Sequence, residues 1–214
     1  PEEDKERHSV IIQIVTRKFT KEELAYWNEY HQDLQDLRDN NIYSIEKMFL
    51  NRKRFVLKDT ELRFGYLYEG RYWKLYRPYN SKKTKWLSNV PLSLAGGLNN
   101  LNKDYNTLVC KALKDQMVCR KIHPYVCHVQ NDSLAAFSLE TVNHIKQNSN
   151  MVYYGGDSDG PGKNASYAIT DTFQWKHINP PDHLLEGCCK DFADWGKRNI
   201  KEVENHFRIK GLIT

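Results

Sequence analysis

After residue 104, the chain alternates short apolar stretches with polar stretches of helical length. The apolar stretches are YNTLVC at 105–110, YVCHV at 125–129 and MVYY at 151–154. They are rich in β-branched and aromatic side chains, which is typical of strands. The expected helices lie at 114–121, 138–147, 164–173 and 200–209. Short strands alternating with helices of about ten residues predict an α/β domain whose parallel sheet is flanked by helices.

Residues 1–103 show no such alternation and predict a smaller α+β subdomain. A capping-box pattern from Thr20 to Glu23 opens a helix that reaches about residue 30, and a second helix is expected at 32–38. The expected strands lie at 9–16 and 42–50, in a hairpin over 64–76 that turns at Glu69-Gly70, and at 82–86. The Gly- and Asn-rich stretch at 93–104 separates this part from a second domain at 104–214.

The hairpin region is strongly basic. Its segment RYWKLYRPYNSKKTK at 71–85 holds six Lys or Arg, four aromatic residues and no acid. A phosphate backbone would meet such a concentration of charge, although a solvated hairpin surface explains it as well. At hairpin spacing, half of the aromatic side chains should face the core instead of a base. The candidate nucleotide- and nucleic-acid-binding residues are Lys74, Arg77, Lys82, Lys83, Lys85 and Trp86.

Composition narrows the class of protein. No window approaches 18 consecutive apolar residues, and the first ten residues, PEEDKERHSV, have neither a signal-peptide core nor an initiating Met. We expect an intracellular, cytoplasmic protein without membrane contact, complete or as a fragment of a longer chain. Five cysteines without a CxxC pair indicate reduced, mostly buried thiols. The net charge of +5 permits an anionic partner without requiring one.

The loop YYGGDSDGPGK at 153–163 places Asp157 and Asp159 among four glycines, directly after an expected strand. A calcium loop counted from Asp157 lacks oxygen ligands at its fifth and twelfth positions, Pro161 and Ala168. A phosphate-binding P-loop requires Ser or Thr where this chain has Asn164. Two readings remain: a magnesium site, since Mg²⁺ is held by one or two carboxylates, and a solvent-facing Asp-Gly turn.

Further acids favour the magnesium site. Asp115 follows the strand that ends at Cys110, and Asp132 follows the next strand. Asp191 and Asp194 follow a short strand expected near residue 178. Ligand-binding groups of open α/β sheets gather at the carboxyl ends of the strands, so these acids are expected at one edge.

These motifs, in this order, resemble the Toprim domain of DNA primases, particularly its divergent phage branch. The Toprim pattern is a strand ending in EGxxD, a later strand ending in DxD before a glycine, and an Asp-containing segment after the next strand. The second element matches DSDG at 157–160 after VYYGG, and the third resembles KDFAD at 190–194. Upstream, 73–89 resembles the basic segment that precedes the Toprim domain in primases, so the resemblance covers about 19–209.

The first Toprim element departs from the pattern. It aligns with CKALKD, which places Asp115 at the motif's aspartate but Lys111 where the family has a glutamate. The family glutamate is thought to act as general acid/base. A lysine of ordinary pKa can bind phosphate but cannot replace a carboxylate. We therefore carry Asp132 as a substitute, and the catalytic candidates are Asp157, Asp159, Asp132 and Lys111.

The resemblance implies a Toprim-like parallel sheet preceded by a basic α+β subdomain, and RNA primer synthesis on single-stranded DNA from ribonucleoside triphosphates. It implies one or two Mg²⁺ (or Mn²⁺) ions. The implied metal ligands are Asp157, Asp159, Asp115 and Asp191. Implied partners are a replicative helicase or a separate zinc-binding domain, and a phage is one candidate source. Two alternatives stay open: another Toprim phosphodiester enzyme such as a nuclease, and a non-catalytic nucleic-acid-binding module, which Lys111 favours.

Overall fold

The computed structural model describes residues 10–58, 60–187 and 189–213 and divides into two compact units. The first unit comprises Pro1–Tyr26 and Asp33–Val90, and the second comprises Trp27–Gln32 and Pro91–Thr214. The division between the units falls within the helix α1 (Lys21–Asn28), between Tyr26 and Trp27. The expected domain boundary after residue 103, with its functional assignment, stays a prediction.

The first unit is built on a six-stranded antiparallel sheet in the order β1-β2-β4-β5-β6, with β3 paired to β2. The strands are β1 (Ile12–Arg17), β2 (Ile42–Leu50), β3 (Lys53–Phe55), β4 (Phe64–Tyr68), β5 (Tyr72–Tyr76) and β6 (Trp86–Ser88). The helix α2 (Leu34–Asp39) precedes β2. The strand expected at 9–16 is β1, and its first residue, Ser9, lies outside the described residues.

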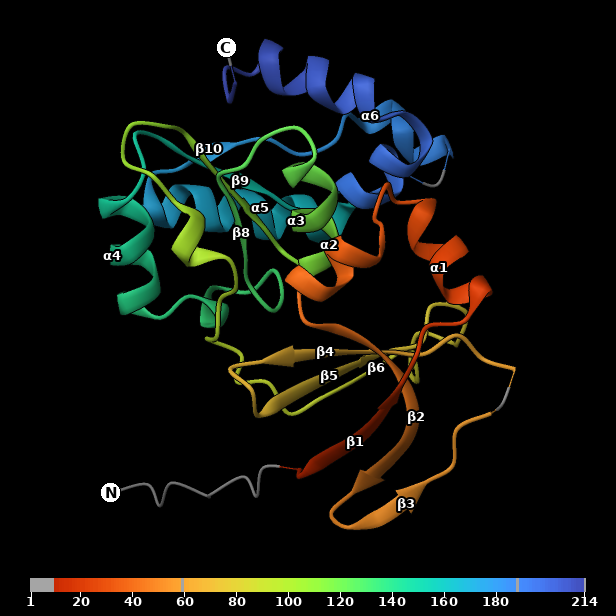
Figure 1. Cartoon of the computed structure of the whole chain (residues 1–214). Coiled ribbons are helices and arrows are strands. Elements are labelled where there is room, and N and C mark those ends of the chain that lie inside the picture. Colours follow the sequence, from red (N-terminus) through yellow and green to blue (C-terminus); the bar gives the residue numbers. More distant parts are fainter. Residues whose placement is uncertain (1–9, 59, 188, 214) are drawn as a thin grey trace, which may run out of the picture. The chain divides into compact units, whose positions relative to one another are not determined.

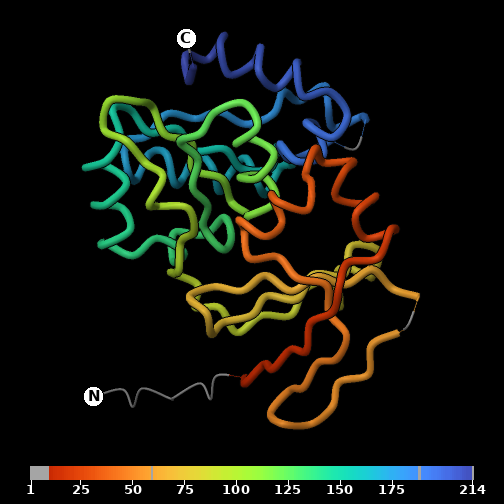
Figure 2. The backbone as a smooth tube through the Cα atoms, viewed as in Figure 1, coloured from red at the N-terminus to blue at the C-terminus, as the bar shows by residue number. Residues whose placement is uncertain are grey.

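Two local predictions for this unit are confirmed. The capping box is present, since the Thr20 N–H donates to Glu23 Oε2 at 2.9 Å and the Glu23 N–H donates to Thr20 Oγ1 at 3.2 Å. The β4–β5 hairpin turns at Glu69 and Gly70, whose φ angles are 49° and 69° (Figure 2). Positive φ at both central residues is what a type I′ turn requires, and it matches the twist of the strands.

The second unit contains the predicted parallel sheet. Its four strands lie in the order β10-β9-β7-β8, and every neighbouring pair is parallel. The strands are β7 (Thr107–Cys110), β8 (Val126–His128), β9 (Val152–Gly155) and β10 (Lys176–His177). The helices are α3 (Leu113–Arg120), α4 (Leu139–Gln147), α5 (Gly160–Phe173) and α6 (Phe192–Ile209).

Helices cover both faces of this sheet (Figure 1). On one face, Leu108 and Tyr153 pack in a cluster with Phe207 from α6. On the other face, the next residue of each strand, such as Val109, packs with Ile169 from α5. Successive side chains of a strand point to opposite faces, so a strand buried on both sides reads as a continuous apolar run.

The starts of three elements differ most from their expected positions. α5 begins at Gly160 rather than 164, because Asp159 caps its N-terminus. α6 begins at Phe192 rather than 200, because Asp191 caps it, and the backbone leaves helical geometry within it at Asn199. β6 begins later than expected, since the Lys85 N–H donates to the Ser81 carbonyl and closes a turn there.

Two further expectations concern thiols and membranes. Cys110, Cys119, Cys127 and Cys189 are free and buried, as predicted, and Cys188 lies outside the described residues. Over the described ranges, each helix is too short or too polar to cross a bilayer.

Candidate active site at the carboxyl edge of the parallel sheet

The ends of β7 and β9 bring Lys111 and Asp157 together. Asp157 lies two residues beyond β9 and is only 3% exposed. Its Oδ2 forms an ion pair with the ammonium of Lys111, the residue that follows β7. A second ammonium, from Lys190, lies 2.8 Å from the same oxygen. The other carboxylate oxygen, Oδ1, is buried and has no hydrogen-bond partner among the described residues.

Interaction with Asp157 raises the pKa of both Lys111 and Lys190, although burial opposes it. Burial disfavours the charge on Lys111, but the negative charge of Asp157 and its hydrogen bond raise the pKa of Lys111 overall. Burial likewise opposes the charge on Lys190, and its hydrogen bond to Asp157 raises its pKa above the ordinary value. Both side chains are therefore ammonium ions at neutral pH.

Asp159 serves the start of α5. Its Oδ1 accepts a hydrogen bond of 2.9 Å from the Gly162 N–H, and this bond lowers the pKa of Asp159 more than any other contact does. Its other oxygen, Oδ2, lies 3.4 Å from the ammonium of Lys190. Because a negative charge at a helix N-terminus is favourable, Asp159 stays ionised.

The two other predicted metal ligands, Asp115 and Asp191, accept hydrogen bonds from backbone N–H groups at the start of α6. Asp115 is 3% exposed, and its Oδ1 accepts a hydrogen bond of 2.9 Å from the Ala193 N–H. Burial, followed by the charge of Asp191, raises the pKa of Asp115 well above its usual range. Asp191 caps the helix by accepting a 2.8 Å hydrogen bond from the Asp194 N–H. The structure thus brings Asp115 and Asp191 close together, as the strand-end argument predicted.

Asn179 holds the loop between β9 and α5 in place. Its Oδ1 accepts from the Gly156 N–H at 2.9 Å, and its Nδ2 donates to the Asp157 carbonyl at 2.7 Å. A Cβ added at Gly162 would lie 2.5 Å from the Cβ of Asp157, so this position requires glycine. Sequence reasoning missed Asn179 and the role of Lys190. A polar residue two positions after β10 was the available signal for Asn179.

Asp132 lies close to Tyr154. Tyr154 is completely buried, and its hydroxyl has no hydrogen-bond partner among the described residues. Burial raises the pKa of Tyr154, and the nearby charge of Asp132 is the next cause, ahead of smaller effects from Asp157 and Asp115. Asp132 itself is partly exposed. The charges of three strand-end acids thus all disfavour ionisation of this buried phenol.

Two of the predicted basic residues of the first unit, Lys74 and Lys85, lie over aromatic rings. The rings of Trp86 and Tyr76 stack with centroids 4.3 Å apart. The ammonium of Lys74 lies 5.1 Å from the Trp86 ring centroid, and that of Lys85 lies 5.6 Å from the Tyr76 centroid. Because Trp86 is exposed and Tyr76 is buried, only the contact of Lys74 holds charge beside an exposed ring.

The other predicted basic residues differ in exposure. Lys82 and Lys83 are exposed in the turn before β6. Arg77 is only 8% exposed, and its guanidinium donates to the Thr84 carbonyl, so it braces this turn. Its direct contact with nucleic acid stays a prediction.

The predicted metal site depends on which oxygen atoms are available as ligands. Within the described ranges, no three His, Cys, Asp or Glu side chains are arranged to hold a metal ion. Asp157 Oδ1 is a buried oxygen with no hydrogen-bond partner in the described part of the chain, and Asp159 Oδ2 belongs to a side chain that is 40% exposed. Mg²⁺ commonly takes one or two protein carboxylates and completes its shell with water and phosphate oxygens. The donors therefore fit an ion that arrives with its phosphate ligands, while metal ligation by Asp115 and Asp191 stays a prediction.

The chain matches no protein-family model, and no curated protein matches it in sequence. Solved structures do match. A DnaG catalytic core superposes with a TM-score of 0.64 at 12% identity, over 86% of this chain and 71% of the other. A DnaG primase catalytic domain bound to single-stranded DNA gives 0.54 at 15%, over 94% and 64%. The primase fragment of the bacteriophage T7 primase-helicase protein gives 0.52 at 9%, over 83% and 70%.

What the chain shares with these structures is the fold, a parallel sheet flanked by helices together with an antiparallel sheet. The chain has the fold of primase catalytic cores, as the Toprim resemblance predicted. It spans about two thirds of the length of the matched chains, 64% in the case of the single-stranded-DNA complex.

Proposed function

We propose that the chain is the catalytic core of a DNA primase and synthesises RNA primers on a single-stranded DNA template. The observation that carries this proposal is the position of Asp157 and Asp159 at the carboxyl end of β9, in a chain with the fold of primase cores. In the reaction, the 3′ oxygen of one ribonucleotide bonds to the α-phosphorus of the next. Pyrophosphate leaves, and the hydroxyl proton must go to a base.

Asp157 Oδ1 and Asp159 Oδ2 would hold Mg²⁺ or Mn²⁺. Such an ion supplies charge neutralisation to the triphosphate and lowers the pKa of the attacking hydroxyl. The chain's own residues do the rest. Asn179 fixes the Asp157 carbonyl by a 2.7 Å hydrogen bond, so the carboxylate is held on a rigid loop. Asp132 has a partly exposed carboxylate at the same sheet edge, which suits a base that accepts the hydroxyl proton.

The first unit would bind the template. Lys74, Lys82, Lys83 and Lys85 supply positive charge, and Trp86 is 39% exposed, so one face of its ring can stack on a base. One structural neighbour is described as bound to single-stranded DNA, and another is part of a primase-helicase protein. By analogy, a helicase or a separate zinc-binding domain would act beside this core, in the cytoplasm.

A second candidate function is a non-catalytic nucleic-acid-binding module. Lys111 favours it, because the residue at the end of β7 is a cation that neutralises Asp157. The two functions differ in product: the module would bind template and make no RNA.

Primer synthesis from ribonucleotides on single-stranded DNA, with Mg²⁺ or Mn²⁺, tests the proposal. We expect short template-dependent RNA from the wild-type chain and none above background from Asp157→Asn. Asp171→Asn, an exposed acid on α5, is the matched control and should keep activity. Equal product from Asp157→Asn would contradict the site. Template binding without product from the wild type would support the module instead.

A further inference from the structure

Two ammonium ions converge on one buried carboxylate at the carboxyl edge of the sheet. Lys111 and Lys190 both contact Asp157 Oδ2, and Lys190 also reaches Asp159 Oδ2. The two positive charges balance the two negative ones. Asp157 Oδ2 is therefore occupied, although Oδ1 of the same carboxylate has no partner among the described residues.

The lysines are more accessible than the acid they pair with. The side chain of Asp157 is 4% exposed, whereas those of Lys111 and Lys190 are 23% and 47% exposed. An ammonium on a flexible four-carbon stem can turn from a buried carboxylate toward solvent without backbone movement. The two lysines thus present positive charge on the outer side of Asp157.

We propose that Lys111 and Lys190 bind the triphosphate of the incoming ribonucleotide, and that Asp157 is their counter-ion until the nucleotide arrives. The inference rests on the proposed function, because it places the nucleotide at this sheet edge. It assigns Lys111 a binding role in place of a catalytic one, and it gives Lys190 a role that its place in the motif did not suggest.

Charge balance explains why the two lysines would leave Asp157 for the triphosphate. A buried carboxylate without a counter-ion is unfavourable, so the lysines remain on Asp157 until phosphate oxygens compete for them. A triphosphate carries several negative charges and accepts charge-assisted hydrogen bonds from ammonium groups. When the lysines move to it, Asp157 Oδ2 becomes free beside Oδ1, so metal ligation and nucleotide binding are coupled.

Two binding measurements, whose affinities should change in opposite directions, test this inference. In EDTA, ATP binding is measured by calorimetry for Lys111→Gln and Lys190→Gln. Without nucleotide, Mn²⁺ binding is measured from the electron paramagnetic resonance signal of the free ion. Loss of a charge-assisted contact should weaken ATP binding about tenfold, and release of Asp157 should tighten Mn²⁺ binding by a similar factor. Lys146→Gln, which removes an exposed charge on α4, should change neither.

A second variant guards against loss of fold. Lys190→Arg keeps the positive charge on a half-exposed side chain and should keep ATP affinity within about threefold of the wild type, since the proposed contact requires a positive charge that can donate to phosphate oxygens. Unchanged ATP affinity in both glutamine variants, or loss of Mn²⁺ affinity in both, overturns the inference. Primer synthesis is a separate readout: opposite binding shifts in a chain that makes no RNA would support the lysine pair and refute the proposed function.

Discussion

The ammonium of Lys111 pairs with the carboxylate of Asp157, joining the ends of β7 and β9 across 46 residues of sequence. Asp157 is nearly inaccessible and Lys111 is largely so, which makes the pair part of the fold as well as of the site. Removing Asp157 leaves the Lys111 charge without its ion-pair partner, whereas removing Lys111 leaves Asp157 paired with Lys190. The pair therefore supports a test that separates structural from chemical roles.

Asp157→Asn should lower the free energy of unfolding by about 1–3 kcal/mol, because the largely buried Lys111 ammonium loses its counter-ion, whereas the half-exposed Lys190 keeps Asp159. Adding Lys111→Met to this variant should restore part of that stability, because the double variant no longer buries the unpaired Lys111 charge. Urea denaturation of the wild type, both single variants and the double variant gives the interaction energy. Simple additivity of the two changes would show that the ion pair has no energetic role.

Much of this site could be predicted from the sequence, because alternation of strands and helices places strand ends at one edge. That argument located Asp157, Asp159 and Asp115 by their distance from an apolar run. It could not show which groups neutralise Asp157, since the contact with Lys190 spans 33 residues and depends on how the loops fold back. Contacts of this kind carry no periodic signal.

The glycine-rich loop was interpreted too simply. Gly160 and Gly162 are expected in the loop before the helix at 164–173, yet both lie within α5. Their low helix propensity is overridden by Asp159 at the N-cap and by the proline in the first turn, signals that the sequence did contain. For α6 the sequence contains the same type of cap, Asp191, yet the predicted helix at 200–209 covers only the part of α6 that follows the irregular backbone at Asn199.

Lys82 and Lys83 should contribute to template binding through charge alone. Each lysine that contacts a phosphate of single-stranded DNA contributes about 0.7 to the slope of log affinity against log salt. Lys82→Ala/Lys83→Ala should therefore reduce the magnitude of that slope by about 1.4. Fluorescence anisotropy with an oligothymidine at several salt concentrations measures it, and Lys146→Ala serves as the control. A slope equal to that of the wild type would place these lysines outside the template path.

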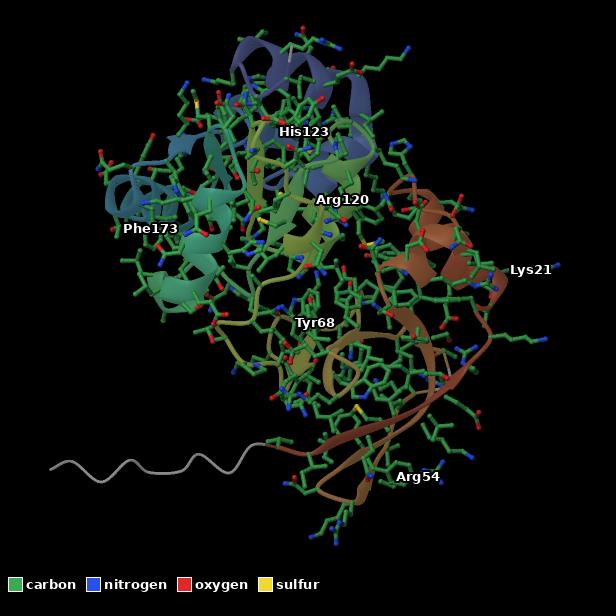
Figure 3. All side chains as sticks on the ribbon, turned by 60° about the vertical axis from the view of Figure 1, so that its left-hand side comes forward. Lys21, Arg54, Tyr68, Arg120, His123 and Phe173 are labelled. Atoms are coloured by element: carbon green, nitrogen blue, oxygen red, sulfur yellow. The ribbon has the colours of Figure 1, made fainter. Side chains whose placement is uncertain are left out.

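His123 should make the stability of the second unit sensitive to acid. His123 is 5% exposed and follows α3, where its Nε2 donates to the Asn106 carbonyl at 2.7 Å (Figure 3). Burial lowers the pKa of His123 below its ordinary value of 6.5. The unfolded chain therefore takes up a proton first as the pH falls. Stability is fully present above about pH 6.5 and declines below it, down to the lowered pKa of the folded state.

The matched variant for that effect is His123→Gln, which can still donate a hydrogen bond to the Asn106 carbonyl but does not titrate. Thermal melting between pH 5 and 8 should show a shallower loss of stability below pH 6.5 for this variant. Some loss should remain, because burial also lowers the pKa values of His177 and His206. Parallel curves for variant and wild type would contradict a contribution from His123.

Asp132 should be required for primer synthesis but not for nucleotide or template binding. If its carboxylate accepts the proton of the attacking hydroxyl, Asp132→Asn removes general-base catalysis and lowers kcat about 10²–10⁴-fold while KM for the ribonucleotide changes little. Tyr154→Phe provides a second probe, because it removes a buried hydroxyl that senses the charge of Asp132 and leaves the packing in place. It should alter the pH dependence of kcat more than its value at the optimum. An Asp132→Asn variant with wild-type kcat would show that another group accepts the proton. Asp132 would then not replace the glutamate of the Toprim pattern.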